Sequence, residues 1–327
     1  MQAVVAEGEG LPLKLARVAR PIAAPGQVLI RVAASGVNPL DLKIRAGLAP
    51  HARHPLPAIL GLDLAGTVEA LGAGVSRFNL GDEVYGMVGG VGGIPGTLAE
   101  FVAGDADSLA PKPVNLSMRE AAVLPLAAIT AWEGLVDRMH VGEGDTLLIQ
   151  GGAGGVGHVA AQLARGFGAQ VYATGGRASR ATIERLGVTF IDREEPWADY
   201  VRRETAGRGF KLVFDTAGGH ALDASFAAVG IFGHVASTLG WGTHALAPLS
   251  FKGGTYSGIF TLMPLLTGTG RGHHGEILRR VARIVEAGKL VPLLDAERFD
   301  LSSVGEAHRK LSERRNGGKL AVDVAPT

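Results

Sequence analysis

Short apolar runs separated by turns characterise the first part of the chain. Residues 27–33 read Gln-Val-Leu-Ile-Arg-Val-Ala and follow a Pro-Gly dipeptide, a pattern typical of a strand that begins after a turn. Similar runs occupy 66–71 and 81–86. Strands this short and this frequent predict a β-rich domain over residues 1–120.

A different pattern begins near residue 118, where helical segments alternate with apolar runs. Strands are predicted over 146–150, 170–174, 212–215 and 233–237. This alternation is the βαβ signature of a parallel sheet. After about residue 265 it stops, and the remaining pattern predicts a helix over 275–287 and a short strand over 320–324. The chain is therefore expected to have an α/β fold in two domains.

The glycine-rich segment 151–157 lies between a predicted strand and a predicted helix. It contains Gly-x-Gly-x-x-Gly over 152–157, and apolar residues then recur at 156, 159, 160, 163, 164 and 167, on one face of a helix. Glycines permit a tight turn and a close approach of a pyrophosphate, whose charge is favoured at a helix start. The predicted contacts are Gly152, Gly154, Gly155, Val156 and Gly157. The alternative is a glycine-rich turn that binds nothing.

The residues after the next predicted strand bear on the choice of dinucleotide. An NAD site has an acidic residue about 20 residues beyond the glycines, which holds the ribose 2′-hydroxyl. Here Thr174 and Gly175, at the strand end, are followed by Arg177 and Arg180, and all four residues are predicted cofactor contacts. The first acid is Glu184. Two guanidinium groups without a carboxylate favour the 2′-phosphate of NADPH. The alternative is a pair of solvated surface arginines.

Composition and charge remove several classes of protein. The 49 glycines among 327 residues show no three-residue period and prolines number only 16, which excludes collagen and low-complexity disorder. With 32 basic and 31 acidic side chains, the chain offers no electrostatic case for a nucleic-acid or membrane partner. Its most apolar stretch, 121–136, is shorter than the roughly 20 residues of a membrane span. The first residues lack a secretory signal, so we expect a cytoplasmic protein.

The chain contains no cysteine. This excludes disulfides, thiolate nucleophiles and cysteine-ligated zinc sites. Another metal site would need histidines such as His51 and His54 together with His273 and His274. Histidine pairs in loops are more often solvated or packed than bound to a metal, and we expect no metal here.

Six sequence blocks occur in an order that resembles one known family. They occupy 36–41, 60–68, 81–86, 126–132, 152–157 and 213–219, and they include Gly-Val-Asn-Pro-Leu-Asp and Val-Phe-Asp-Thr-Ala-Gly-Gly. Together they resemble the medium-chain dehydrogenase/reductase superfamily, and within it the zinc-independent quinone oxidoreductase (zeta-crystallin-like) branch. The resemblance implies a GroES-like β-rich catalytic domain from 1–120 and 265–327 and a Rossmann-type doubly wound parallel sheet over 121–264. It also implies an active site in the cleft between the domains and a homodimer formed through the nucleotide-domain sheets.

The resemblance also bears on metal. Zinc members of the superfamily carry a ligating cysteine in the block where this chain has Val37 and Asn38, and Gly-His-Glu where it has Leu62 and Asp63. Valine and leucine cannot ligate a metal, so the resemblance implies a zinc-free enzyme. The hard chemistry then belongs to NADPH, which gives hydride to an electron-poor conjugated carbonyl compound such as a quinone or an enone.

The resemblance implies roles for individual residues. Asn38 is expected near the nicotinamide ribose and the substrate, with Asp41 one short step further along. Lys43 stands where some quinone oxidoreductases have a tyrosine. Its ammonium group could stabilise an enolate or deliver a proton, or it is a surface lysine whose stem packs beside its neighbours. Further cofactor contacts are implied for Thr130, Thr216, Gly218, Ser237, Leu239, Phe260 and Lys319, the last near the cofactor phosphates. Core packing is the alternative for Thr130 and Phe260, and a solvated side chain for Lys319.

These features favour an NADPH-dependent, zinc-free reductase of quinones or other α,β-unsaturated carbonyls that acts by hydride transfer. An enoyl-thioester or polyketide-type enoyl reductase on the same scaffold is the first alternative. The second belongs to another class of protein, because a fold does not dictate a function. It is a non-catalytic NADPH-binding structural or regulatory protein similar to zeta-crystallin.

Overall fold

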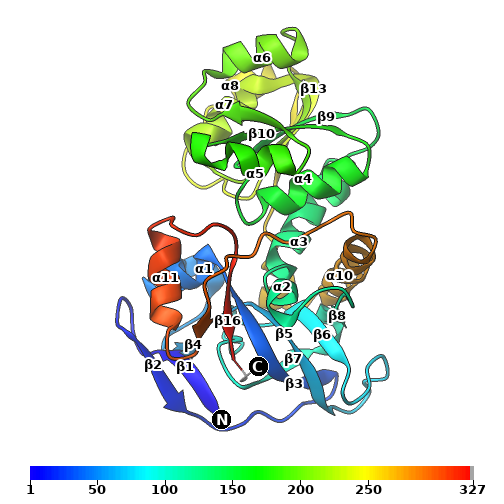
Figure 1. Ribbon diagram of the computed structural model, residues 1–327. Coiled ribbons are helices and arrows are strands. Elements are labelled where there is room, and N and C mark those ends of the chain that lie inside the picture. Colours follow the sequence, from blue (N-terminus) through cyan, green and yellow to red (C-terminus); the bar gives the residue numbers. More distant parts are fainter. Residues whose placement is uncertain (325–327) are drawn as a thin grey trace. The chain divides into compact units, whose positions relative to one another are not determined.

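The apolar runs of the first part of the chain form two largely antiparallel sheets in the computed structural model, which describes residues 1–324 (Figure 1). The smaller sheet has the strand order β2-β1-β4, and the larger has the order β15-β16-β3-β5-β6-β8, with β7 also paired to β3. Their strands are β1 (Gln2–Ala6), β2 (Leu13–Arg17), β3 (Gln27–Val37), β4 (Ala58–Ile59), β5 (Asp63–Leu71), β6 (Glu83–Met87), β7 (Phe101–Asp105), β8 (Leu109–Pro111), β15 (Phe299–Asp300) and β16 (Leu320–Asp323).

Strand β3 organises the larger sheet. It pairs with β5 along one edge, and along the other edge with β7 and then β16. Helix α2 (Met118–Ala122) packs on β3 and β5, and most residues of β3 are buried. The register places Leu320 opposite Val37, so β16 starts beside the end of β3 that leads into α1. The helices of this part are α1 (Pro39–Arg45), η1 (Pro50–Ala52), η2 (Ala106–Ser108), α9 (Met263–Thr267), α10 (Arg271–Glu286) and α11 (Val304–Ser312).

The segment Thr130–Thr261 contains a six-stranded parallel sheet in the order β11-β10-β9-β12-β13-β14. Its strands are β9 (Thr146–Gln150), β10 (Gln170–Gly175), β11 (Thr189–Asp192), β12 (Phe210–Asp215), β13 (Val229–Ser237) and β14 (Thr255–Gly258). The four strands predicted from the sequence lie within β9, β10, β12 and β13. The chain order reverses beside β9, and open α/β sheets bind ligands at such a switch point.

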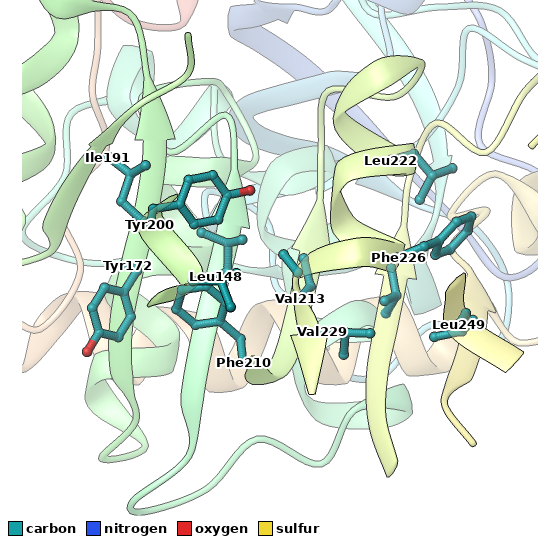
Figure 2. Close-up of a cluster of buried hydrophobic side chains, with 13 residues drawn as sticks. Leu148, Tyr172, Ile191, Tyr200, Phe210, Val213, Leu222, Phe226, Val229 and Leu249 are labelled. Carbon is teal, nitrogen blue, oxygen red and sulfur yellow. The ribbon is translucent and has the colours of Figure 1, made fainter. Parts of the chain in front are cut away.

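Helices flank this parallel sheet (Figure 1). They are the π-helix η3 (Glu133–Arg138), α4 (Gly157–Gly166), η4 (Arg177–Ser179), α5 (Arg180–Arg185), α6 (Trp197–Thr205), α7 (His220–Ala228) and α8 (Ala247–Ser250). Figure 2 shows the apolar core formed by sheet strands with α6, α7 and α8. Within it, the rings of Tyr172 and Phe210 meet edge to face with centroids 5.2 Å apart. Buried aromatic side chains of this kind contribute much of the apolar area of a core.

The chain divides into two compact units, Met1–Ile129 with Leu262–Thr327, and Thr130–Thr261, which we call unit 1 and unit 2. A β-rich unit 1 and a doubly wound unit 2 confirm the predicted α/β fold class. Helix α3 (Pro125–Trp132) crosses the border. Residues 121–129 were predicted in the nucleotide domain but belong to unit 1, because α2 packs on β3 and the Leu126 N–H bonds to Asp63.

Residues 262–264 likewise belong to unit 1, although the sequence analysis placed them in the nucleotide domain. Residues 325–327, the end of the predicted catalytic domain, lie outside the described residues. Among residues 1–324, no helix combines the length and the apolar character that crossing a bilayer requires.

Candidate active site

The loop between β9 and α4 has a backbone that depends on glycine. Gly151 has a φ of +86°, and a Cβ atom on Gly157 would lie 2.1 Å from the carbonyl oxygen of Gly151. A Cβ atom on Gly152 would lie 2.4 Å from a neighbouring side chain. By contrast, Gly154 and Gly155 are exposed. The loop is therefore tightly closed on the protein side, while its exposed backbone is open to a ligand.

Helix α4 begins directly after this loop. Val156 occupies the N-cap position, and within the described part of the chain no side chain caps the first turn. The N–H groups at a helix start carry a partial positive charge that favours an anion. This arrangement fits the pyrophosphate site predicted from the sequence.

Thr174, at the carboxyl end of β10, supports the loop. Its hydroxyl donates to Gln150 Oε1 (2.7 Å) and accepts the N–H of Gly151 (3.1 Å). The side chain is buried. The structure therefore places this predicted cofactor contact against the loop backbone, where it fixes the position of Gly151.

Arg177 and Arg180 follow β10 and line a cavity of about 420 Å³. The other lining residues are Phe190, Asp192, Glu195, Arg203 and Glu204. Arg177 Nε donates to Asp192 Oδ2 (2.9 Å), and Arg180 Nε donates to Glu184 Oε1 (2.8 Å). The two arginine side chains are 90% and 65% exposed. Since a guanidinium group has five N–H donors, these contacts leave donors for a phosphate.

Asp192 is an acid beside Arg177 that the sequence analysis missed. It ends β11, and the register pairs it with Gly175 at the end of β10. The hydrogen bond from Arg177 holds the pKa of Asp192 below its usual range, with the Glu194 N–H adding to the effect. Strand β11 was not predicted, so nothing in the sequence pattern placed this carboxylate beside the end of β10.

Asp215 organises the carboxyl ends of β12 and β13. It is buried and accepts from Ser237 Oγ (2.6 Å) and from the N–H of Gly218 (3.0 Å). Ser237 Oγ accepts in turn from the N–H of Leu239 (3.1 Å), and Thr216 donates to the carbonyl oxygen of the last residue of β9 (2.6 Å). Four predicted cofactor contacts, Thr216, Gly218, Ser237 and Leu239, therefore gather at one edge of the sheet. Asp215 connects Gly218, Ser237 and, through Ser237, Leu239, whereas Thr216 is held by β9.

Thr130 belongs to a short hydrogen-bonded chain in unit 2. Its Oγ1 lies 3.1 Å from Thr261 Oγ1, and Thr261 donates to Glu133 Oε2 (2.9 Å). Because the Thr261 hydroxyl gives its one proton to the carboxylate, Thr130 is the donor in the first bond.

Phe260 is half-buried, and its ring meets the ring of Trp241 edge to face with centroids 6.2 Å apart. It is therefore not an ordinary core residue.

Unit 1 contains four buried polar side chains near the end of β3, which we call the polar cluster. They are Asn38, Asp41, Asp63 and Lys319, and none is more than 8% exposed. Asn38 Nδ2 donates to Asp63 Oδ2 (2.9 Å). Lys319 Nζ donates to Asn38 Oδ1 and to the carbonyl oxygen of Val37 (3.2 Å). Residues from β3, β5 and the start of β16 thus meet around one side-chain amide.

Each carboxylate oxygen of the polar cluster accepts an N–H. Asp41 Oδ2 accepts from the Asn38 N–H (2.8 Å), and Asp41 Oδ1 accepts from the Gly61 N–H (3.2 Å). Asp63 Oδ1 accepts from the Leu126 N–H (3.0 Å), and its other oxygen takes the Asn38 amide. Both carboxylates are therefore fixed in position, as buried polar groups generally are.

Burial dominates the electrostatics of the polar cluster. It raises the pKa of Asp41 to about 7 and the pKa of Asp63 to about 6, against the lowering effect of the Lys319 charge and of the N–H donors. The charge of Asp63 also raises the pKa of Asp41. Burial lowers the pKa of Lys319, and the two carboxylates oppose that shift. The polar cluster can therefore hold or release a proton near neutral pH.

Lys43 differs from Asn38 and Asp41 because it is exposed. Burial, and after it the charge of Lys43, lowers the pKa of His51 in η1, so the Lys43 ammonium group lies near enough to η1 to affect its electrostatics.

Val37 and Leu62, which stand in the blocks where zinc enzymes carry ligands, are buried. Within residues 1–324, no three His, Cys, Asp or Glu side chains are grouped so that they could bind a metal ion.

Lys319 occupies a place that the sequence analysis did not anticipate. It was expected near the cofactor phosphates, whereas its ammonium group lies in the polar cluster on Asn38. The hydrogen bond from Asn38 to Asp63 was also not predicted. The available signal was an acid inside the apolar run 60–65, since an acid in a buried strand is paired or hydrogen-bonded.

Two family models match the chain. The alcohol dehydrogenase GroES-like domain matches residues 24–114, and the zinc-binding dehydrogenase family matches residues 186–322. The first match confirms the GroES-like character predicted for the β-rich domain. The second names a family in which zinc is common, and it covers parts of both units.

Several relatives are similar over nearly the whole chain. The 2-methylene-furan-3-one reductase of Solanum lycopersicum is 33% identical over 96% of this chain and 76% of its own length. The NADPH-dependent alkenal/one oxidoreductase of Arabidopsis thaliana, a chloroplastic protein, is 33% identical over 92% of this chain and 72% of its own length. The phthioceranic/hydroxyphthioceranic acid synthase of Mycobacterium tuberculosis is 32% identical over 98% of this chain. The chain spans only 15% of the length of that synthase.

Solved structures share the fold. An alcohol dehydrogenase superfamily protein from Novosphingobium aromaticivorans is 55% identical with a TM-score of 0.98, over 99% of this chain and 100% of that one. The quinone oxidoreductase from Coxiella burnetii is 30% identical with a TM-score of 0.84, over 99% of both chains. The CurK enoyl reductase is 25% identical with a TM-score of 0.87, also over 99% of both chains.

Proposed function

Because the chain belongs to the medium-chain dehydrogenase/reductase superfamily, in its quinone oxidoreductase branch, we propose that it is an NADPH-dependent, zinc-free reductase of quinones or other α,β-unsaturated carbonyls. The observation that carries the proposal is the glycine loop before α4, together with Arg177 and Arg180 after β10. The alkenal/one oxidoreductase from Arabidopsis thaliana supports both the cofactor and the substrate class.

Unit 2 offers a complete set of groups for NADPH. The exposed backbone of the glycine loop and the start of α4 suit the pyrophosphate, and Arg177 and Arg180 suit the 2′-phosphate. The residues gathered at the sheet edge, Thr216, Gly218, Ser237 and Leu239, with Thr130 and Phe260, are proposed contacts of the nicotinamide half. When bound, NADPH supplies the hydride that adds to the electron-poor carbon of the acceptor.

Side chains of unit 1 suit the charge that hydride addition leaves on the acceptor oxygen. An N–H donor or a cation stabilises such charge. The Asn38 amide has two N–H donors, of which Asp63 takes one, so one remains for a ligand. We assign orientation of the acceptor to Asn38, and stabilisation of its oxygen or delivery of the proton to the exposed Lys43. Asp41 fixes the backbone of Asn38. Since Val37 and Leu62 have no ligand atoms in their side chains, these polar groups take the place of a metal.

Steady-state oxidation of NADPH and of NADH, each with a quinone, an enone and an enoyl thioester, tests this proposal. We expect NADPH to be oxidised with the quinone or the enone, and faster than NADH. Faster oxidation of NADH would contradict the proposed cofactor. Preference for the enoyl thioester would favour the alternative of an enoyl reductase, which the similarity to the CurK enoyl reductase supports. Binding of NADPH without turnover of any acceptor would contradict an enzyme and favour a non-catalytic NADPH-binding protein.

Replacing Arg177 and Arg180 together by alanine tests the choice of cofactor. We expect the Kd of NADPH to rise by about 10²-fold or more, because each of two charged hydrogen bonds to a phosphate contributes about 1.5–3 kcal/mol. The Kd of NADH, which lacks the 2′-phosphate, should change little. Arg202→Ala on α6, an exposed arginine paired with Asp199, is the matched control. Equal losses for both cofactors, measured by fluorescence titration, would overturn the assignment.

We also propose a homodimer formed through unit 2. Strand β14 is an edge of the parallel sheet, so one side of its backbone has no neighbouring strand within the described chain. Ile231 and Phe232 of the neighbouring strand β13 and Phe251, shortly before β14, are 74%, 84% and 90% exposed. A strand edge next to exposed aromatic side chains is a surface that a second copy of the chain can cover by strand pairing.

A further inference from the structure

We infer that Lys319 is a positioning residue for Asn38. Together with Asp63 it holds the Asn38 side-chain amide in one orientation, with the oxygen on the ammonium group and the nitrogen on the carboxylate. The inference rests on the proposed function, because it takes Asn38 as a contact of the nicotinamide and the acceptor. It gives Lys319 a task inside unit 1 in place of the phosphate contact expected from the sequence.

The backbone of Lys319 is held on both sides. Lys319 directly precedes β16, whose first residue is opposite Val37, so it stands next to Asn38 in the register. Its N–H donates to the carbonyl oxygen of Leu293 (2.7 Å), and its own carbonyl oxygen accepts from the Asp295 N–H (2.9 Å). The ammonium group is buried and also donates to the Val37 carbonyl oxygen. It therefore has little freedom to leave the Asn38 oxygen.

The two charged partners decide which way the Asn38 amide faces. A flipped amide would place Oδ1 against the Asp63 carboxylate, so that two acceptors would face each other. It would also place the NH₂ group against the Lys319 ammonium group, so that two donors would face each other. A buried polar group that loses its hydrogen bond costs about 1–3 kcal/mol. Two such losses leave only the observed orientation populated.

The fixed orientation has a direct use in the reaction. One N–H of the amide is bound to Asp63, and Asp63 is itself fixed by the Leu126 N–H. The other N–H is then the single donor that Asn38 can present to a ligand, and its direction is set before the ligand arrives. Burying two carboxylates and an ammonium group costs more free energy than filling the same space with apolar side chains. Such a buried charged cluster is therefore weak evidence of a stabilising role, which fits a positioning role.

Crystal structures of Lys319→Met and Lys112→Met test the inference without any substrate. Lys112 is the matched control, because it is also a buried lysine of unit 1 whose ammonium group donates to backbone carbonyl oxygens. We expect the Asn38 amide to rotate or to adopt two orientations in Lys319→Met, and to stay unchanged in Lys112→Met. An unchanged amide in both variants would overturn the inference. If Lys319→Met does not fold, Lys319→Leu, which also removes the donor, takes its place.

Kinetics separate positioning from a contact with cofactor phosphates. In Lys319→Met we expect kcat to fall by about 10²-fold, as for a displaced orienting group. The Kd of adenosine 2′,5′-bisphosphate, which carries phosphates without nicotinamide, should stay within about twofold. Lys319→Arg, which keeps charge and donors, should recover part of kcat. Unchanged kcat, or a large loss of affinity for the bisphosphate, would contradict the positioning role. If the unaltered protein turns over no acceptor, the proposed function fails while the crystal structures still decide the inference.

Discussion

His308 on α11 shows what burial without a partner does to a titratable side chain. It is 2% exposed, and among the described residues neither of its ring nitrogens has a hydrogen-bond partner. Burial, and after it the nearby charge of Arg45, lowers the pKa of His308 to about 4. The imidazole is therefore neutral in the folded chain at pH 5, where the unfolded chain binds a proton.

We expect His308 to make unit 1 sensitive to acid. Its folded pKa lies below the unfolded value of about 6.5, so its contribution to stability is complete above that pH and is lost as the pH falls toward 4. Between pH 7.5 and pH 5 the loss amounts to about 2 kcal/mol. The unfolding free energy, measured in urea, should fall between pH 7.5 and pH 5. We expect this fall to be smaller by about 2 kcal/mol in His308→Leu than in the unaltered protein.

His220→Leu is the control for this experiment, because the His220 side chain is fully exposed. It should leave the pH dependence of the unfolding free energy unchanged. If His308→Leu and the unaltered protein lose the same free energy between pH 7.5 and pH 5, the buried imidazole is not the cause.

The polar cluster shows how far residue-level prediction reaches. The resemblance of block 36–41 to the family implied Asn38 and Asp41 as candidate site residues. Lys319 is 281 positions away from Asn38, and only the register of β16 on β3 brings the two together. No spacing along the chain reveals that register, so the contact could not be predicted from the sequence.

At the level of elements, periodic segments were predicted well and short or glycine-rich ones were not. The strand–loop–helix unit around 146–166 is confirmed in type and position. Strands β11 and β14 were missed because each has four residues of which at most two are apolar, whereas the equally short β16 is an apolar run and was predicted. The helix predicted over 275–287 begins four residues earlier, because α10 starts at Arg271. A Cβ atom on Gly275 would lie 2.2 Å from the Asp107 carbonyl oxygen, so this glycine serves close packing of a helix.

Gly157→Ala should disrupt the nucleotide loop. The new methyl group would lie 2.1 Å from the carbonyl oxygen of Gly151, a backbone atom that cannot move aside unless the loop opens. We expect the Kd of NADPH, measured by calorimetry, to rise by at least about 10²-fold, since the loop backbone positions the pyrophosphate.

Gly166→Ala, at the other end of α4, is the matched control. It has open space around it and ordinary helical backbone, so it should keep the affinity for NADPH. It should also stabilise the fold by about 0.5–1 kcal/mol, because alanine favours a helix over glycine. Equal affinity in both variants would show that the loop does not bind the cofactor.

For the molecule as a whole, the exposed edge of unit 2 predicts association. Phe232 has a φ of +56°, a left-handed conformation that is strained for a bulky residue and that asparagine adopts more readily. Asparagine is therefore the replacement that should remove the apolar side chain without disturbing the backbone. We expect the unaltered protein to sediment as a dimer and the double variant Phe232→Asn with Phe251→Asp to sediment as a monomer. Ile22→Asp, an equally exposed apolar position of unit 1 at 88%, should leave the dimer intact. Dimers in the double variant would place the interface elsewhere.

The order in which the two units can form during synthesis follows from the late position of β16. Unit 2 is one contiguous segment, so its whole sheet can form while the ribosome is still translating the rest. Strand β3 can pair with β16 only after about 280 further residues, up to Lys319 and beyond, have been synthesised. Synthesis of that length takes roughly 15–60 s. A chain released before Lys319 would carry the proposed nucleotide-binding fold without a completed polar cluster. Under the proposed function, premature termination would thus leave a chain that binds NADPH without the group that orients the acceptor.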